Sequence, residues 1–219
     1  MNQSNFVVIE LRFLPKYESS QRSDSNHKQP EMNFFWLVEM QNAMKENAEA
    51  HCDEHVRKMP IESAQMLYTV LWQKDPIGAW RFSAPFTKDG VARGYKPVKN
   101  GHPVITWAGL SLTNYQLCVD YGLALCTEYT KRYKKVHDTE RHLHFLRANP
   151  PELEDCGRTP VPLVVNKGKK KAITILEPDL HKACEIYRKF YITDKARFAS
   201  YDHTPRPEWW ENKTQLLSV

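Results

Sequence analysis

The stretch HCDEHVRKMPIESAQ, residues 51–65, carries ionisable and amide side chains at helical intervals. His51, His55, Lys58, Glu62 and Gln65 are separated by four, three, four and three positions. Because successive residues of a helix are rotated by about 100°, this spacing places all five side chains within an arc of about 80°. Such a face is a solvated surface, a metal site or the polar wall of a pocket.

An amine beside carboxyl groups is the arrangement that nucleophilic catalysis by lysine requires. Lys58 lies between Asp53 and Glu62, and either carboxylate could instead activate a water molecule. His55 and Arg57 are close in sequence, and cationic neighbours favour the neutral form of an amine. The competing interpretation is an ordinary ion pair on a helix surface, since Lys58 and Glu62 are four positions apart.

The two histidines of the stretch are also four positions apart, which suits a pair of metal ligands on one helix face. A catalytic zinc site needs a third ligand, and no spacing singles out one of the candidates, which are His102, His137, His142 and His144. We therefore predict no metal and no cofactor. The sequence has no GxSxG, GxxxxGK[ST] or GxGxxG motif, so serine hydrolysis, nucleotide hydrolysis and dinucleotide redox chemistry have no support.

The bulk properties are those of an ordinary soluble protein with a mild basic excess. The chain has 219 residues, 41% of them hydrophobic, and a net charge of +5, which allows one sizeable core and fits an anionic partner such as nucleic acid. Five cysteines without a CxxC pair indicate reduced thiols inside a cell. No apolar run reaches the roughly 18 residues of a membrane span. We expect an intracellular monomer without a membrane partner, in the host cytoplasm or in the nucleus of a eukaryotic host.

Three long helices are predicted to position these residues, over about 40–73, 107–135 and 179–199. Pro60 falls inside the first, where it either kinks the helix or starts a second one. The residues expected to contribute to the core are Val56, Met59, Met66, Leu67 and Val70 in the first helix, Leu110, Leu117, Tyr121 and Leu125 in the second, and Tyr187 in the third.

The remaining segments are predicted to be strands, loops and a terminal extension. The run MNFFWLVEM, which begins at Met32, indicates a buried strand. TPVPLVV and AITIL are short strand candidates in an otherwise irregular region, 138–178, and the KGKKK tract between them is expected as a solvated loop. Residues 1–31 include a polar stretch of disordered composition. The expected fold is mainly α: a single helical domain over 32–219 with a short N-terminal strand and minor β-strand elements, preceded by a partly disordered extension over 1–31.

Four sequence blocks carry a resemblance to known proteins. The blocks are HCDEHVRKMPIESAQML, NGHPVITWAGLSLTNYQL, CTEYTKRYKKVH, and YRKFYITDKARFA followed by PEWW. In this order they resemble a family of viral, phage and bacterial proteins labelled pyrimidine-dimer DNA glycosylases, from about Met32 to Trp210. The chain departs from the family's pattern at Glu54 and Arg57, where lysine and valine are common, and at Lys134, which replaces a glycine.

The resemblance implies a DNA-binding domain with its catalytic groups in the 51–65 stretch. The family's prototype uses an N-terminal amine as nucleophile, whereas a polar leader precedes the domain here, so Lys58 or a water activated by Asp53 or Glu62 would attack, with His55 nearby. A nucleotide flipped from the duplex would enter a pocket between this stretch and the 107–135 helix. Cations hold phosphates and aromatic side chains stack on bases. DNA contacts are therefore expected from His102, Trp107, Asn114, Tyr115, Arg132, Lys135, Arg188, Tyr191 and Lys195.

The expected function is base excision in DNA repair, by a DNA glycosylase-like enzyme acting on a flipped or damaged pyrimidine. Similar helical proteins in phages are implicated in thymine hypermodification. The alternative is therefore a transferase that modifies an activated thymine-derived base of viral DNA, in which the cations bind pyrophosphate and Lys58 stabilises charge. A third possibility is a DNA-binding module without catalysis.

Overall fold

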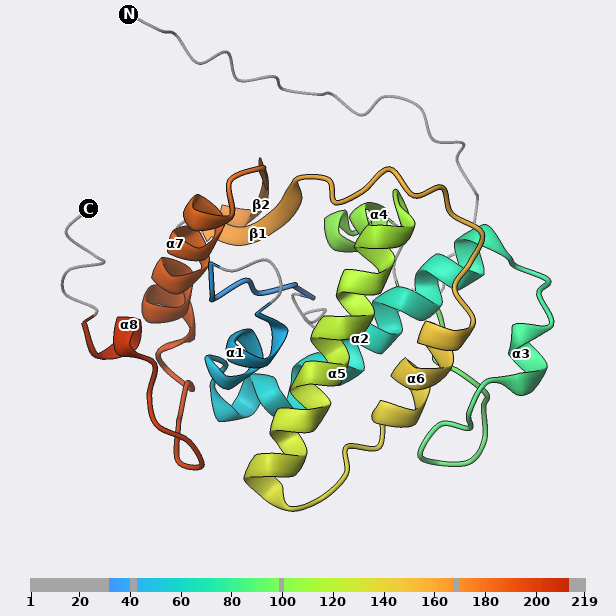
Figure 1. The fold of residues 1–219 in the computed structure, drawn as a ribbon, viewed down its shortest axis with the longest axis horizontal. Coiled ribbons are helices and arrows are strands. Elements are labelled where there is room, and N and C mark those ends of the chain that lie inside the picture. The colour runs from blue at the N-terminus through green and yellow to red at the C-terminus, as the bar shows by residue number, and fades with distance from the viewer. Residues whose placement is uncertain (1–31, 40–42, 99–100, 168–169, 213–219) are drawn as a thin grey trace, which may run out of the picture. The chain divides into compact units, whose positions relative to one another are not determined.

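The computed structural model describes residues 32–39, 43–98, 101–167 and 170–212, and this part of the chain is mainly helical, as predicted (Figure 1). The expected extension over 1–31 lies outside the described residues. The elements in chain order are α1 Met44–Glu49, α2 Asp53–Lys74, α3 Trp80–Ser83, α4 Pro103–Ala108, α5 Leu112–Tyr133, α6 Glu140–Ala148, β1 Val161–Lys167, β2 Lys170–Glu177, α7 Leu180–Phe190, the π-helix η1 Tyr191–Lys195 and α8 Glu208–Glu211. Among the described helices, none has the length and apolar character needed to cross a membrane.

The core forms where the two longest helices, α2 and α5, pack against each other and α6 lies against both. The predicted core face of α2 is confirmed, because all of its members are buried: Val56, Met59, Met66, Leu67 and Val70. In α5, Leu125 is buried, whereas Leu117 is only partly buried. Gly122 permits the close approach of the three helices, since a Cβ atom there would lie 3.1 Å from Ser63 Cβ of α2 and 2.9 Å from Leu143 Cδ1 of α6.

Each of the three predicted helices is interrupted in the structure. The first is divided between α1 and α2 at residues 50–52, and Pro60 lies inside α2 and does not start a helix. The second is divided between α4 and α5 at residues 109–111, where Leu110 is exposed instead of facing the core. The third changes from α7 to the π-helix η1 at Tyr191. Because apolar residues continue across each break, hydrophobic periodicity did not reveal them.

The segment 32–37 is buried as expected but forms no strand. Its backbone is held by side chains instead: the Leu37 N–H donates to Asn47 Oδ1 at 2.6 Å, and Asn47 Nδ2 donates to the Phe35 carbonyl at 3.0 Å. Asn33 Nδ2 donates to the carbonyl of Val164 in β1 at 2.6 Å. An irregular segment can thus lie in the core, because amide side chains replace the hydrogen bonds of a sheet.

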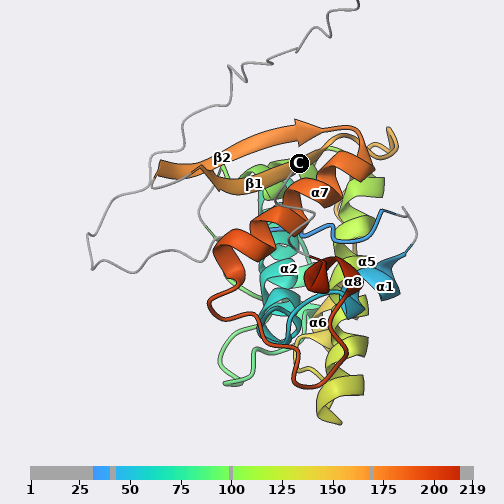
Figure 2. The ribbon, with the colours of Figure 1, turned by 90° about the vertical axis from the view of Figure 1, so that its left-hand side faces the viewer.

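The region 138–178 is more regular than predicted. It contains α6, which was not expected, and the two strand candidates are confirmed as the antiparallel hairpin β1–β2. Lys167 ends β1 and Lys170 begins β2, so the KGKKK tract is partly strand and not simply a loop. The hairpin packs through β1 on α7 and α4 (Figure 2).

A buried arginine joins α5 to the turn between α1 and α2. Arg132, in the last turn of α5, donates from Nε to Glu128 Oε1 at 2.7 Å and from Nη1 to Asp53 Oδ1 at 2.9 Å. It also donates to the carbonyl oxygens of His51 and Glu49, each at 3.0 Å. Its side chain is only 1% exposed. One guanidinium therefore pairs with two buried carboxylates and satisfies carbonyl groups that the end of α1 leaves without helical partners.

Asp53, the first residue of α2, extends this cluster to the segment that follows η1. Its Oδ2 accepts hydrogen bonds from the Asp202 N–H at 2.6 Å and from Ser200 Oγ at 3.3 Å, and its own N–H donates to the Ser200 carbonyl at 2.8 Å. Burial raises the pKa of Asp53, but the hydrogen bonds from Arg132, Asp202 and His203 outweigh it and hold the pKa below its usual value. The start of α2, the end of α5 and residues 200–203 thus meet at one charge cluster, which we call the Arg132 cluster.

Replacing Leu125 by alanine should lower the free energy of unfolding by roughly 2–5 kcal/mol, because a fully buried leucine leaves a cavity. Leu117→Ala is the matched control from the same helix, and its effect should be smaller because that side chain is partly exposed. Urea unfolding of both variants measures the difference. An equal or larger loss from Leu117→Ala would contradict the described packing of α5.

Replacing Arg132 by glutamine should lower the free energy of unfolding by roughly 3–5 kcal/mol, because Asp53 and Glu128 would be left buried without their cation. Arg141→Gln is the control: Arg141 Nη2 lies 3.1 Å from Asp138 Oδ1, but its side chain is 48% exposed. Loss of that exposed pair should cost less than about 1 kcal/mol. If Arg132→Gln unfolds at the wild-type urea concentration, the Arg132 cluster does not stabilise the fold.

Candidate active site

The polar stretch at residues 51–65 is not a solvated face. His51 lies in the turn before α2, and the other four side chains belong to α2. His51, His55 and Glu62 are buried, whereas Lys58 and Gln65 are partly exposed. Burying two imidazoles and a carboxyl group carries an energetic cost, so each needs a partner or a function.

Each of the two histidines is hydrogen-bonded to a tyrosine. His51 Nδ1 lies 2.6 Å from the Asn47 carbonyl and must carry the proton, so Nε2 accepts from the Tyr121 hydroxyl at 2.8 Å. Burial lowers the pKa of His51 to about 3. His55 Nδ1 is hydrogen-bonded to the hydroxyl of Tyr191, in η1. Both imidazoles are therefore neutral at physiological pH, as His55 also has a pKa well below its usual value because of burial.

The histidines are not joined by further metal-binding groups. Among the described residues, no cluster of three histidine, cysteine or acidic side chains could hold a metal ion. The His55 ring instead stacks on Phe35, with centroids 4.8 Å apart and planes inclined by 12°. The segment 32–37 thus forms the packing surface of His55, a role that the strand prediction for MNFFWLVEM did not identify.

Lys58 and Glu62 form an ion pair that spans the boundary between solvent and interior. Lys58 Nζ lies 2.8 Å from Glu62 Oε1, and the two side chains are 43% and 3% exposed. Within the described structure, neither oxygen of Glu62 accepts a well-aligned hydrogen bond. Burial raises the pKa of Glu62, although Lys58, Lys195 and the backbone amide of Asn33 oppose that shift.

Lys195, at the end of η1, completes the group. Its positive charge lowers the pKa of both His55 and Glu62, which places it near these two residues of α2. The Tyr191–His55 hydrogen bond independently joins η1 to the same turns of α2. The structure therefore brings together side chains separated by more than 100 positions: His55, Lys58, Glu62, Tyr191 and Lys195. A buried carboxyl group with a raised pKa beside an accessible amine is typical of a catalytic site.

The predicted opposite wall, on α5, does not form one pocket with this group. Asn114 lies 18 positions before Arg132 on α5, which is about 27 Å along the helix axis. The amide of Asn114 instead donates to the Trp107 carbonyl at 2.9 Å and to Thr159 Oγ1 at 2.8 Å. Lys135 is exposed beyond the end of α5. Arg132 reaches the start of α2 through Asp53, and Glu128 pairs with Arg132 in the same cluster.

Several residues expected to contact DNA have no free surface for it. Trp107, Tyr115 and Tyr191 are buried, so none presents a ring face on which a base could stack. Arg132 is buried with its donors already in use, and Asp53 is held in the same cluster. The burial of the three aromatic residues agrees with their helical spacing, because large aromatic residues at such spacing most often belong to the core.

The remaining predicted contacts lie at or near the surface. Arg188 donates from Nε to the Leu37 carbonyl at 2.9 Å and pairs with Glu39 at 3.1 Å. His102 is partly buried and caps α4 by accepting a hydrogen bond from the Val104 N–H. Lys135 is exposed and Lys195 is partly exposed. Of the predicted phosphate-binding cations, Lys195 is the one whose charge lowers the pKa of Glu62.

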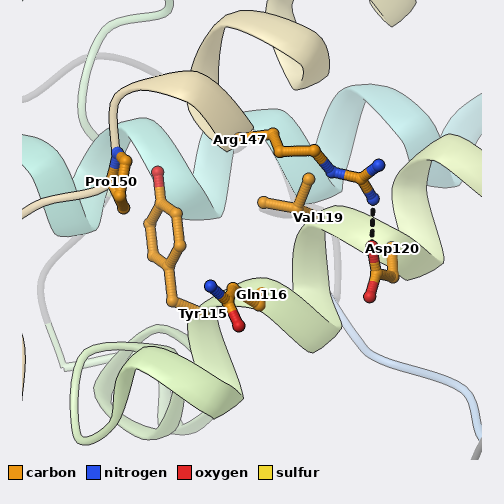
Figure 3. Close-up of a pocket in the computed structure, with 6 residues that line it drawn as sticks. All are labelled: Tyr115, Gln116, Val119, Asp120, Arg147 and Pro150. Atoms are coloured by element: carbon orange, nitrogen blue, oxygen red, sulfur yellow. Dashed lines mark hydrogen bonds and ion pairs between the residues drawn. The ribbon is translucent and has the colours of Figure 1, made fainter. Parts of the chain in front are cut away.

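A separate pocket lies between α5 and the end of α6 (Figure 3). Its volume is about 160 Å³, and Asp120 and Arg147 form an ion pair at its edge. Ligand sites for drug-sized molecules usually measure about 300–1,000 Å³. The pocket is therefore too small to accommodate a nucleotide, and it contains none of the groups with perturbed acid–base properties on α2.

Comparisons with known proteins identify no relative of this chain. The chain matches no family model, and no curated protein or solved structure shows significant similarity to it. The resemblance to pyrimidine-dimer DNA glycosylases stays a prediction from the four sequence blocks.

Proposed function

We propose that this chain is a DNA glycosylase-like enzyme that excises a flipped or damaged pyrimidine, with Lys58 as the reacting amine. The observation that carries the proposal is the Lys58–Glu62 pair, in which an accessible amine touches a buried carboxyl group whose pKa is raised. The sequence resemblance supplies the class of substrate, and the pair supplies chemistry that fits it. A carboxylate with a raised pKa is a stronger base than an exposed one, which suits proton transfer from a lysine.

The reaction would begin when Glu62 takes a proton from Lys58. The free electron pair on Nζ then attacks the sugar C1′ atom, an N–C bond forms, and the glycosidic bond to the base breaks. The bonding electrons leave with the pyrimidine, which regains a proton from Glu62. Glu62 then accepts the second Nζ proton and passes it to the ring oxygen O4′ as the C1′–O4′ bond breaks, which leaves a protonated imine between Nζ and C1′. Because the reacting C1′ atom must reach Nζ, the nucleotide has to leave the duplex stack.

The neighbouring residues would position this pair and bind charge. His55 is neutral, stacked on Phe35 and hydrogen-bonded to Tyr191, so it adds no competing positive charge beside Lys58. Lys195 supplies a second cation near the carboxylate, suited to a phosphate that flanks the flipped nucleotide. Two lysines near one site also suit the alternative function, a transferase that modifies an activated base. In that reaction both ammonium groups would stabilise pyrophosphate and no imine would form.

Lys58→Ala should abolish product formation on pyrimidine-modified duplex DNA, since no other amine occupies that position. Nucleosides and free bases released from the DNA are measured by mass spectrometry. Borohydride should trap wild-type protein on the DNA if an imine forms, and Lys58→Ala should not be trapped. Lys131→Ala removes another surface lysine that pairs with carboxylates and should keep wild-type activity. A folded, fully active Lys58→Ala protein would refute the proposed role.

In the same assay the transferase alternative has a distinct result. It predicts a new modified nucleoside, loss of that product in Lys58→Ala, and no borohydride trapping in either protein. Duplex binding without any change in the DNA would instead indicate a non-catalytic module.

Glu62→Gln should inactivate the enzyme and also make it more stable at neutral pH. The pKa of Glu62 is raised in the folded state, so the protonated carboxyl group is favoured by folding. Its stabilising effect is present below the unfolded pKa of about 4.5 and is lost as the pH rises through the folded pKa. Glutamine resembles the protonated acid and does not titrate.

The stability difference between Glu62→Gln and wild type should therefore be larger at pH 7 than at pH 4. Urea unfolding at a series of pH values measures it. Glu54→Gln, an exposed change on the same helix, serves as the control and should show little pH-dependent difference. A Glu62→Gln protein that is less stable than wild type at pH 7 would show that the ion pair with Lys58 outweighs the burial of the carboxylate.

A further inference from the structure

The segment 74–96, which follows the site helix α2, exposes large apolar side chains on an ordered scaffold. Ile77, Phe82 and Val91 are 87%, 82% and 81% exposed, and Phe86 is 43% exposed. These four are half of the large hydrophobic side chains that are exposed among the described residues. Such a concentration marks an interaction surface more often than scattered exposed residues do. We call residues 74–96 the wedge surface.

The wedge surface is anchored to the second half of α2. The Trp80 ring lies 5.5 Å from the ring of Trp72 and 5.8 Å from that of Tyr68, and Trp80 is buried. The loop beyond α3 is closed by its own hydrogen bonds, with the Thr87 N–H donating to the Ala92 carbonyl at 2.7 Å. The exposed apolar side chains are thus held outward by fixed backbone and do not belong to a loose loop.

Cations alternate with these apolar side chains along the segment. Five exposed positive residues belong to the wedge surface: Lys74, Arg81, Lys88, Arg93 and Lys96. Within the described residues, none of the five forms a salt bridge. The segment has only two carboxylates, Asp75 and Asp89, and Asp89 accepts hydrogen bonds from within its own turn.

Both arginines of the wedge surface lie over aromatic rings. The guanidinium of Arg81 is 4.1 Å from the ring centroid of Trp72, and that of Arg93 is 3.9 Å from the ring centroid of Phe86. This stacking fixes the positive charges beside the exposed apolar groups. Fixed cations beside apolar side chains match nucleic acid, where cations contact phosphates and apolar wedges enter a groove or a base step.

The distance between the wedge surface and the candidate active site determines which part of a DNA molecule the wedge surface could bind. Lys74 ends α2 sixteen positions after Lys58, which is about 24 Å along the helix axis. That length corresponds to about seven base pairs of duplex DNA. In Figure 1, α3 lies at the end of α2 that is far from α7. A duplex must therefore be longer than this separation to contact both the wedge surface and the Lys58 site.

We infer that the wedge surface binds the flank of duplex DNA about seven base pairs from the nucleotide that enters the Lys58 site. The inference rests on the proposed function for the choice of DNA as partner. The cations contact the backbone phosphates of the flank, and Phe82 and Val91 pack into a groove or against a base step.

Binding to duplexes of two lengths tests this inference on the full chain. A duplex of about 30 base pairs reaches the wedge surface, whereas one of about 10 base pairs extends only about 17 Å from a central target nucleotide. Phe82→Ser should raise the Kd for the long duplex at least about fivefold and leave the Kd for the short duplex nearly unchanged. Lys88→Gln should reduce the slope of log affinity against log salt by about 0.9 on the long duplex only.

The matched control is a pair of valines. Val91→Ser lies on the wedge surface and Val136→Ser lies in the turn between α5 and α6, and the two side chains are 81% and 72% exposed. Only Val91→Ser should weaken binding to the long duplex. Equal effects of the two variants, or equal effects on both duplex lengths, would overturn the inference.

Two further measurements identify a different occupant. If Phe82→Ser binds DNA like wild type but loses binding to vesicles of phosphatidylcholine and phosphatidylserine, the surface is a membrane contact and the inference is overturned. Sedimentation that shows a wild-type dimer and a Phe82→Ser monomer, with unchanged DNA binding, would make it a self-association surface and also overturn it.

Failure of the proposed catalysis gives a separate result. If wild-type protein leaves DNA unchanged while Phe82→Ser and Val91→Ser still weaken binding to the long duplex alone, the wedge surface is supported and the Lys58 reaction is not. If Lys58→Ala abolishes product while these variants bind both duplexes like wild type, the reaction is supported and the wedge surface is not.

Discussion

The fold around the candidate site depends on the guanidinium of Arg132. Its donors are distributed between two carboxylates, Asp53 and Glu128, and two backbone carbonyls at the turn before α2. A planar guanidinium can satisfy several acceptors in fixed directions, which an ammonium group cannot do. The cluster therefore fixes where α2 begins and how it meets α5. The position of every later residue of α2, including Lys58 and Glu62, follows from that starting point.

Two buried carboxyl groups on α2 have pKa values shifted in opposite directions, although burial raises the pKa of both. Asp53 accepts hydrogen bonds from Arg132, Asp202 and Ser200, and its pKa is lowered. Glu62 pairs with Lys58, but neither of its oxygens accepts a well-aligned hydrogen bond in the described structure, and burial raises its pKa. A fully satisfied buried charge stabilises one arrangement of the chain, whereas a poorly satisfied one carries a cost that folding alone does not explain. This contrast is the physical reason for assigning chemistry to Glu62 and structure to Asp53.

The sequence predicted best where helical period alone decides the outcome. The spacing in α2 correctly separated the core residues, such as Val56 and Met66, from the polar stripe, because both follow from a rotation of about 100° per residue. The breaks at residues 50–52 and 109–111 were not predictable from that period, since buried residues such as Cys52 and Ala108 continue through them. The strand expected after Met32 failed for a different reason. Its backbone is satisfied by Asn47, and no local pattern reveals a hydrogen bond to a residue in another element.

The same limit applies to the candidate site. Sequence spacing placed Lys58 beside Glu62, because a separation of four is a local property of a helix. It could not show that Tyr191 would bind His55 or that Lys195 would lie near Glu62, because those contacts depend on how the chain returns from α7 to α2. It also assigned Arg132 to phosphate binding, since an arginine near the end of a helix has the same sequence signature whether it is exposed or enclosed by two carboxylates.

The Arg132 cluster also holds the segment that follows η1 against α2. Lys195 ends η1 only five positions before Ser200, whose carbonyl accepts the Asp53 N–H and whose hydroxyl donates to the Asp53 carboxylate. Tyr191, at the start of η1, is held on the other side by His55. The short segment with Lys195 is therefore attached to α2 at both ends, at Asp53 and at His55, which are themselves only two positions apart. Both attachments lie within the first turn of α2, and the charge of Lys195 lowers the pKa of Glu62, which lies about two turns further along the helix. The Arg132 cluster and the Lys58–Glu62 pair thus both involve α2. The cluster holds the segment that carries Lys195, whose charge lowers the pKa of Glu62.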